Sequence, residues 1–124
     1  MEKKRIMIVD DEPSFTRTTR YLLEQTGDYQ VCEVNDSCQA IATGRAFKPD
    51  LILLDVVMPQ LDGGEVVTKI RADPFLREVP VVFLTALMER DESENGPQER
   101  GGYRFLSKLV SREQILDCIE TCVA

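Results

Sequence analysis

The sequence predicts an α/β protein in which a parallel β-sheet is covered by helices on both faces. Five short apolar runs alternate with segments of helical periodicity along the 124 residues. The runs at residues 6–9 and 51–54 are apolar without interruption, which is typical of strands buried on both faces. Strands that alternate with helices favour right-handed crossovers within a single sheet. The length corresponds to one domain, so we expect residues 1–124 to fold together.

Each expected element has a local reason in the sequence. Pro13 opens the first helix, because proline suits a first turn. Asp36 or Ser37 caps the second helix, and Ser111 with Gln114 forms a capping-box pair for the last one. The expected strands cover residues 5–10, 29–34, 51–54, 80–84 and 103–107. The expected helices cover residues 13–26, 37–47, 65–72 and 111–123.

A fourth helix, between the last two strands, is expected to be short, frayed or partly disordered. Residues 89–100 contain no aliphatic or aromatic side chain and include Gly96-Pro97. A helix that packs on a sheet needs an apolar face, which this stretch does not supply. We therefore expect weak amide-exchange protection over residues 89–100.

Composition excludes several classes of function. The formal net charge of −7 disfavours direct binding to nucleic acid, because an acidic surface repels phosphate. No apolar run approaches the length of a membrane span, and the basic start leads into an acidic segment rather than a signal peptide. We expect a cytoplasmic protein. The four cysteines lack the histidine or the spacing of a zinc site and are expected to act as small apolar residues.

Polar residues stand where four of the five expected strands end. Asp10 and Asp11 follow the first strand, Asp55 the third, Thr85 the fourth and Lys108 the fifth. Sites in open α/β sheets form outside the carboxyl ends of the strands, so these residues are expected to converge.

The converging residue types suggest phosphoryl chemistry. Three carboxylates at close range repel one another, and a cation relieves that repulsion. Oxygen ligands alone suit a hard ion such as Mg²⁺, which keeps positions for water and a phosphoryl oxygen. One carboxylate can then act as a nucleophile and form an acyl phosphate. A threonine hydroxyl and a lysine ammonium are suitable partners for phosphoryl oxygens.

These residues also carry a resemblance. The segments Ile8-Val9-Asp10-Asp11-Glu12-Pro13, Leu53-Leu54-Asp55-Val56-Val57-Met58-Pro59 with Asp62-Gly63, and Leu84-Thr85-Ala86, together with Gly101 and Lys108, resemble the receiver domain of two-component response regulators over nearly the whole chain. The resemblance implies a flavodoxin-like, doubly wound five-stranded parallel sheet in strand order 2-1-3-4-5, in three αβα layers.

The resemblance also implies roles for residues. Asp55 resembles the phosphoacceptor, and Asp10 and Asp11 resemble the acidic pair at the Mg²⁺. The backbone carbonyl of Val57 completes the protein ligands in such a site. The remaining roles fall to three residues: Thr85 as the switch hydroxyl, Lys108 as the cation that pairs with the phosphoryl group, and Phe105 as the aromatic that turns inward on activation.

Three departures from the family pattern stand out. Leu109 follows Lys108 where receivers usually have proline, which puts the pose of the lysine in doubt. The fourth helix lies on the family's usual output face and is degraded here. Val57 and Leu87 are apolar at positions that influence attack of water on the acyl phosphate, which predicts slow self-dephosphorylation.

The implied function is a phosphoacceptor switch rather than an enzyme, with only Mg²⁺-dependent self-phosphorylation and self-dephosphorylation. A partner histidine kinase or histidine phosphotransfer protein supplies the phosphoryl group, because the chain contains no histidine. The output is either a downstream protein or a fused output domain in a longer parent chain, and the sequence leaves a homodimer open.

Two rival functions stay open at this level. An aspartyl phosphatase of the haloacid dehalogenase type shares the Mg²⁺ and carboxylate logic, but it places its acids in an Asp-x-Asp pattern after the first strand. A receiver-like module that binds proteins without phosphorylation is the second rival, suggested by Leu109 and the fourth helix. A flavin site is disfavoured, because no Gly-rich phosphate loop follows the first strand.

Overall fold

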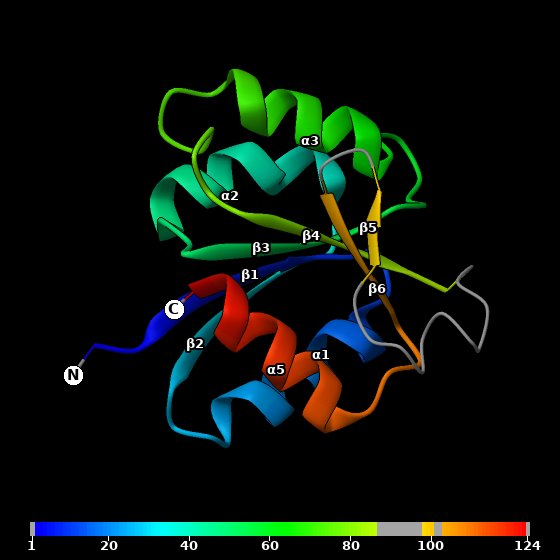
Figure 1. Cartoon of the computed structure of the whole chain (residues 1–124). Helices are drawn as coiled ribbons and strands as arrows, with labels where there is room; N and C mark the ends of the chain where they lie inside the picture. Colours follow the sequence, from blue (N-terminus) through cyan, green and yellow to red (C-terminus); the bar gives the residue numbers. More distant parts are fainter. Residues whose placement is uncertain (1, 87–97, 101–102, 124) are drawn as a thin grey trace.

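The structure, a computed structural model, describes residues 2–86, 98–100 and 103–123. In this part of the chain a β-sheet lies between two pairs of helices, in three layers (Figure 1). Helices α1 (Pro13–Glu24) and α5 (Arg112–Val123) cover one face of the sheet. Helices α2 (Ala40–Phe47) and α3 (Gly63–Ala72) cover the other.

The sheet confirms the predicted topology. Its described strands run in the order β2-β1-β3-β4-β6-β5, and the first five of these pair in parallel. They correspond to the predicted order 2-1-3-4-5. Their bounds are β1 Lys4–Val9, β2 Tyr29–Val34, β3 Leu51–Asp55, β4 Val81–Thr85 and β6 Tyr103–Ser107.

Strand β5 (Gln98–Arg100) is an addition that sequence patterns did not predict. It pairs antiparallel with β6, with Gln98 opposite Phe105 and Arg100 opposite Tyr103 (Figure 1). Within the stretch where a short, frayed or partly disordered fourth helix was expected, residues 98–100 thus form a strand, whereas residues 89–97 lie outside the described residues. A segment without apolar side chains gains little by packing as a helix, but its backbone still forms ladder hydrogen bonds at a sheet edge.

Strands β3 and β4 and residues 6–9 of β1 are buried on both faces of the sheet, as their continuous apolar sequence predicts. Along β1, Ile6 and Ile8 pack with the cluster under α1 and α5, whereas Met7 and Val9 pack with the cluster under α2 and α3. All five residues of β3 are buried. This alternation follows from the two-residue period of a strand, and it fixes the register that brings the strand ends level with one another.

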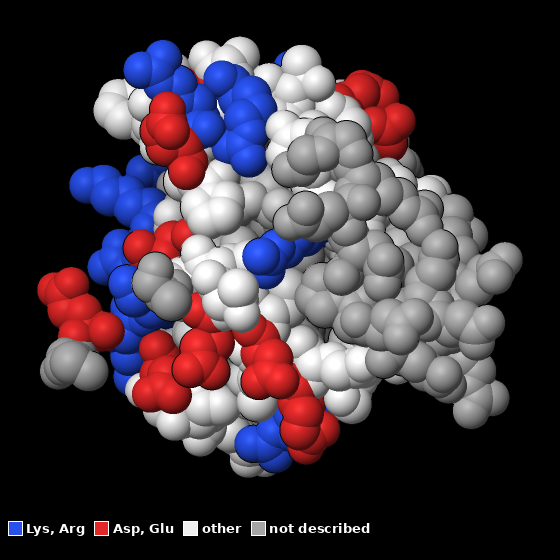
Figure 2. All heavy atoms as spheres, viewed as in Figure 1, with Lys and Arg blue, Asp and Glu red and all other residues white. Residues whose placement is uncertain are grey.

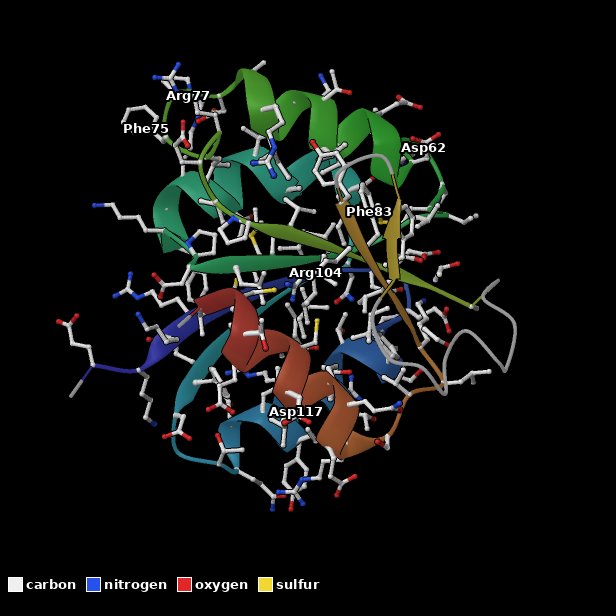
Figure 3. The ribbon with its side chains drawn as sticks, viewed as in Figure 1. Asp62, Phe75, Arg77, Phe83, Arg104 and Asp117 are labelled. Atoms are coloured by element: carbon white, nitrogen blue, oxygen red, sulfur yellow. The ribbon has the colours of Figure 1, made fainter. Side chains whose placement is uncertain are left out.

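Helix caps hold the loops at the carboxyl edge in place. Asp62 Oδ1 accepts from the Glu65 N–H at 2.9 Å and begins α3, where Figure 3 labels it. Asp36 caps a short 3₁₀ turn (η1, Ser37–Gln39) that precedes α2. The predicted capping box is confirmed: Ser111 Oγ accepts from the Gln114 N–H at 3.2 Å, and Gln114 Oε1 accepts from the Ser111 N–H at 2.9 Å.

Acidic and basic side chains lie intermingled on the face of the molecule seen in Figure 2. No helix of the described chain is long and apolar enough to cross a membrane.

All four cysteine thiols are free. Cys118 belongs to the core under α5, where burial and the neighbouring Cys122 raise its pKa to about 12. Cys38 is exposed and does not act as core filler.

Candidate phosphoacceptor site

The sheet register brings the predicted polar residues to one edge. Asp10 directly follows β1, Asp55 ends β3, Thr85 ends β4 and Lys108 directly follows β6. Val9 pairs with Leu54, Asp55 with Leu84, and Thr85 with Ser107. Parallel strands in this register end side by side, so their terminal side chains share one pocket.

Three carboxylates form the acidic part of this pocket. Asp10, Asp11 and Asp55 each offer an oxygen, and these atoms lie within 4.8 Å of one another. Asp10 is fully buried, Asp55 is 5% exposed and Asp11 is exposed. Asp10 Oδ1 accepts from the Glu12 N–H at 2.9 Å, and its buried Oδ2 pairs with Lys108. This set of three carboxylates offers oxygen ligands only, which fits a hard divalent cation.

Lys108 places a positive charge among the carboxylates. Its Nζ lies 2.6 Å from Asp10 Oδ2 and 3.5 Å from Asp55 Oδ2. It also lies 3.1 Å from Glu12 Oε1 and 4.8 Å from the ring centre of Phe15, a cation–π distance. Burial works to lower the pKa of Lys108, but the Asp10 and Glu12 carboxylates outweigh it and raise the pKa overall. The lysine therefore stays charged at neutral pH.

Asp55 has an unusual protonation equilibrium. Burial, and next the charge of Asp10, raise its pKa from an ordinary 3.8 to about 6. Lys108 and a hydrogen bond from the Val57 N–H oppose this rise. A group desolvated beside a like charge is typical of functional sites, and at neutral pH Asp55 is still mainly a carboxylate.

The other predicted residues surround Asp55. Val57 follows it by two positions, and its side chain is 63% exposed. Thr85 is buried, and its backbone carbonyl accepts from the Lys108 N–H at 3.0 Å. Phe105 is half-buried and stacks on Phe83, with ring centres 5.0 Å apart and planes at 22°. Phe83 points from β4 toward the α3 side (Figure 3), so the Phe105 ring lies against this core.

The loop after Lys108 accommodates leucine in place of proline. The Leu109 N–H donates to Ser107 Oγ at 3.0 Å, a bond that proline, which has no N–H, does not form. The Val110 N–H donates to the Ser107 carbonyl at 3.3 Å. This turn directs Lys108 into the pocket while the Leu109 side chain is 74% exposed. The doubt about the pose of Lys108 is thus resolved in favour of the acidic pocket.

Sequence reasoning missed several residues of the site. Glu12 contacts Lys108, and the run of three acids was the only signal for it. Asn35 and Ser37 reach the acid-bearing loops from the end of β2. Gly63 packs against the Asp55 backbone, where a Cβ would lie 2.6 Å from the Asp55 carbonyl oxygen. Only the spacing of Gly63 after Asp55 hinted at this close approach.

Comparisons with known proteins agree with this geometry. The family described as "Response regulator receiver domain" matches residues 6–120. Protein PilH of Pseudomonas aeruginosa is 31% identical over 120 residues, which cover 97% of this chain and 98% of PilH. The alkaline phosphatase synthesis transcriptional regulatory protein PhoP of Bacillus subtilis is 36% identical over 112 residues, and these cover 90% of this chain but 45% of PhoP.

A solved structure of another receiver domain shares the fold of this chain. The receiver domain of sensor histidine kinase PA1611 from Pseudomonas aeruginosa, which has a magnesium ion coordinated in its active-site cleft, aligns with a TM-score of 0.81 and 27% identity. The alignment covers 98% of each chain. This chain therefore belongs to the response regulator receiver domain family, whose members act as phosphoacceptor switches in two-component signalling.

Proposed function

We propose that this chain accepts a phosphoryl group on Asp55 and thereby changes the surface that it offers to another protein. The observation that carries the proposal is the position of Lys108 Nζ, 2.6 Å from Asp10 Oδ2 and 3.5 Å from Asp55 Oδ2, at the carboxyl edge of the sheet. A carboxylate beside a fixed cation and a metal-binding acid is suited to become an acyl phosphate. The intact acidic set disfavours a module that binds proteins without phosphorylation.

The metal in this proposal is Mg²⁺, with Asp10, Asp11, Asp55 and the Val57 carbonyl as its protein ligands. All four groups offer oxygen, which Mg²⁺ prefers, and the carboxylates of the three aspartates already lie together. When bound, Mg²⁺ neutralises charge on the carboxylates and on the phosphoryl oxygens.

The transfer itself uses groups on both proteins. An Asp55 carboxylate oxygen forms a bond to phosphorus while the bond from phosphorus to a donor imidazole nitrogen breaks and leaves its electron pair on that nitrogen. The donor is a histidine kinase or histidine phosphotransfer protein, because this chain has no histidine. Lys108, held 3.5 Å from Asp55 Oδ2, donates to the transferred phosphoryl group and offsets its charge.

The switch couples the phosphoryl group to β4 and β6. Thr85 closes on a phosphoryl oxygen through its hydroxyl, and Phe105 responds on the neighbouring strand, since Thr85 pairs with Ser107 and Phe83 with Phe105. Phosphorylation shifts the equilibrium only as far as it favours one state over the other. The recipient of this change is a downstream protein or a fused output domain.

The proposal excludes turnover of phosphate esters. The chain catalyses only its own phosphorylation and dephosphorylation, unlike a phosphatase of the haloacid dehalogenase type. Its acids are adjacent after β1, with the acceptor at the end of β3, rather than in an Asp-x-Asp pattern. Free thiols suit a reducing compartment, so we place this exchange in the cytoplasm.

The acyl phosphate is predicted to hydrolyse slowly. The Val57 side chain is exposed beside the acceptor and apolar, so it cannot orient a water molecule through a hydrogen bond. The predicted partner in this effect, Leu87, lies outside the described residues. Val57→Asn is expected to shorten the phosphoryl lifetime several-fold, measured as loss of phosphoprotein by intact mass after donor removal. A wild-type lifetime of seconds would contradict the prediction.

Phosphoryl uptake tests the proposed function directly. Wild type and Asp55→Asn are incubated with Mg²⁺ and acetyl phosphate, then analysed by intact mass and amide NMR. We expect wild type to gain one phosphoryl group, with shifts near Thr85 and Phe105, and the variant to gain none. A folded wild type with neither a mass gain nor shifts on addition of beryllofluoride overturns the proposal.

A further inference from the structure

We propose that Asn35 and Ser37 are positioning residues that tie together the two acid-bearing loops of the site. They belong to the bracket loop, residues 35–38, which follows the edge strand β2 and offers no carboxylate to the acidic cluster. The inference rests on the proposed function, because the site that these residues shape is the one assigned to Mg²⁺ and Asp55.

Asn35 holds the first acid-bearing loop. Its Nδ2 donates to the Asp10 backbone carbonyl at 2.8 Å and to Thr16 Oγ1 at 3.0 Å, so both amide hydrogens are used. Asp10 is fully buried, and a carbonyl there needs a partner because water is excluded. The backbone N–H of Asp10 donates to the Val34 carbonyl at 2.9 Å. The peptide groups on both sides of Asp10 are thus fixed from β2 and the bracket loop.

Thr16, which accepts a hydrogen bond from Asn35, is itself hydrogen-bonded to Glu33. Thr16 is fully buried, and its hydroxyl donates to Glu33 Oε1 at 2.7 Å. The other oxygen of Glu33 lies 3.4 Å from Arg20 Nη1. The single hydrogen of the Thr16 hydroxyl has acceptors in Glu33 Oε1 and, at 3.1 Å, in the Pro13 carbonyl, so Thr16 Oγ1 acts as an acceptor toward Asn35. The amide of Asn35 is therefore locked in one orientation by a network with charged groups at its far end.

Ser37 holds the second acid-bearing loop, which follows Asp55. It is buried, and its hydroxyl donates to the Pro59 carbonyl at 3.2 Å and accepts from the Leu61 N–H at 3.3 Å. A neighbouring contact reinforces this link, because Cys38 Sγ lies 3.1 Å from Gln60 Oε1. One hydroxyl thus joins both ends of the turn at residues 59–61, within the loop that follows Asp55.

The bracket loop therefore sets the spacing between the two halves of the metal site. Its Asn35 contacts the loop that carries Asp10 and Asp11, and its Ser37 contacts the loop that follows Asp55. A hard cation with strict coordination geometry is sensitive to that spacing, and loss of groups that orient metal ligands commonly weakens binding by tenfold or more. We infer that Asn35 and Ser37 raise the affinity for Mg²⁺ without binding it.

Titration of Mg²⁺ into the whole chain tests this inference. Amide NMR shifts of the acidic loops give the Kd for wild type, Asn35→Ala and Ser37→Ala, and thermal unfolding in EDTA shows that each variant is folded at the titration temperature. Each variant is expected to bind Mg²⁺ about tenfold more weakly. Ser37→Ala removes a single oxygen atom, so it keeps the test decisive if Asn35→Ala fails to fold.

Matched controls separate positioning from general stability. Gln25→Ala removes a side-chain amide that donates to Tyr21 at 2.9 Å, and Thr68→Ala removes a hydroxyl that donates to the Gly64 carbonyl at 2.8 Å. Both are expected to keep the wild-type Kd. If the bracket variants lose thermal stability but keep the wild-type Kd, the inference is wrong and the proposed function stands. If wild type binds no Mg²⁺, both the metal assignment in the proposed function and this inference are wrong.

Discussion

Asp55→Asn is expected to stabilise the metal-free protein while it abolishes phosphoryl uptake. Burial and the charge of Asp10 raise the pKa of Asp55 to about 6 from an ordinary 3.8. At pH 7 the folded state therefore carries a carboxylate that it disfavours relative to the unfolded chain. A neutral amide removes this penalty, and because water partly screens the charge of Asp55 the gain is on the order of 1–2 kcal/mol.

The pH dependence of this gain has a definite sign. Between pH 4 and 6 the folded state binds more protons at Asp55 than the unfolded state does, because its folded pKa is the higher one. The contribution of Asp55 to stability is therefore favourable at low pH and lost as pH rises through about 6. The difference in unfolding free energy between variant and wild type should grow from pH 4.5 to 7 and then level off.

Denaturant unfolding in EDTA at several pH values measures this difference. Asp117→Asn, which changes an exposed carboxylate on α5 (Figure 3), serves as the control and is expected to leave the profile nearly unchanged. Saturating Mg²⁺ should stabilise wild type more than the variant, because it binds the folded acidic site. A variant less stable than wild type at pH 7 without metal contradicts the account of Asp55.

Gly63→Ala is expected to destabilise the fold by about 2 kcal/mol and to lower phosphoryl uptake. A Cβ at this position would lie 2.6 Å from the Asp55 carbonyl oxygen and 3.2 Å from the Phe83 ring. The backbone oxygen has no freedom to give way. The first turn of α3 must therefore move away from β3, although the Gly63 N–H donates to the Val56 carbonyl at 2.9 Å. That movement also displaces the segment next to the acceptor.

Gly64→Ala is the matched control for this prediction. The nearest contact of its added Cβ is Asp62 Oδ1 at 3.3 Å, the end of a side chain. Alanine also favours helix over glycine by up to about 1 kcal/mol, so this variant should match or exceed the stability of wild type. Denaturant unfolding and the mass assay report both effects. Equal stability of the two variants would show that the close approach at Gly63 carries no cost.

The positions of most strands and helices along the chain were predictable because burial leaves a strong local pattern of apolar residues in the sequence. Strands buried on both faces appear as continuous apolar runs, and the predicted strand and helix ranges match the observed elements within a few residues. Strand β5 was not predictable in this way. Its pairing with β6 depends on backbone hydrogen bonds at a sheet edge, and these require no particular side chains.

The residues of the candidate site likewise fall into those that the sequence pattern predicted and those that it did not. Asp10, Asp55, Thr85 and Lys108 were recognisable because each polar residue ends or directly follows an apolar strand. Glu12, Asn35 and Ser37 carried no comparable signal, since each sits in a polar loop where such residues are common. Their roles depend on distances across the sheet edge, such as the 2.8 Å from Asn35 Nδ2 to the Asp10 carbonyl.

The sequence by itself thus determined the alternation of strands and helices and the set of acids at the strand ends, because apolar periodicity and the spacing of polar residues after strands are local properties. The strand order followed from the resemblance to the receiver family that these motifs carry. Only the tertiary structure decided that Lys108 reaches Asp10 and Asp55 despite Leu109, that Asp55 is desolvated, and that the bracket loop spans the two acid-bearing loops. These features arise from contacts between segments far apart in the chain, and the energy of such contacts depends on burial and distance that no local pattern encodes.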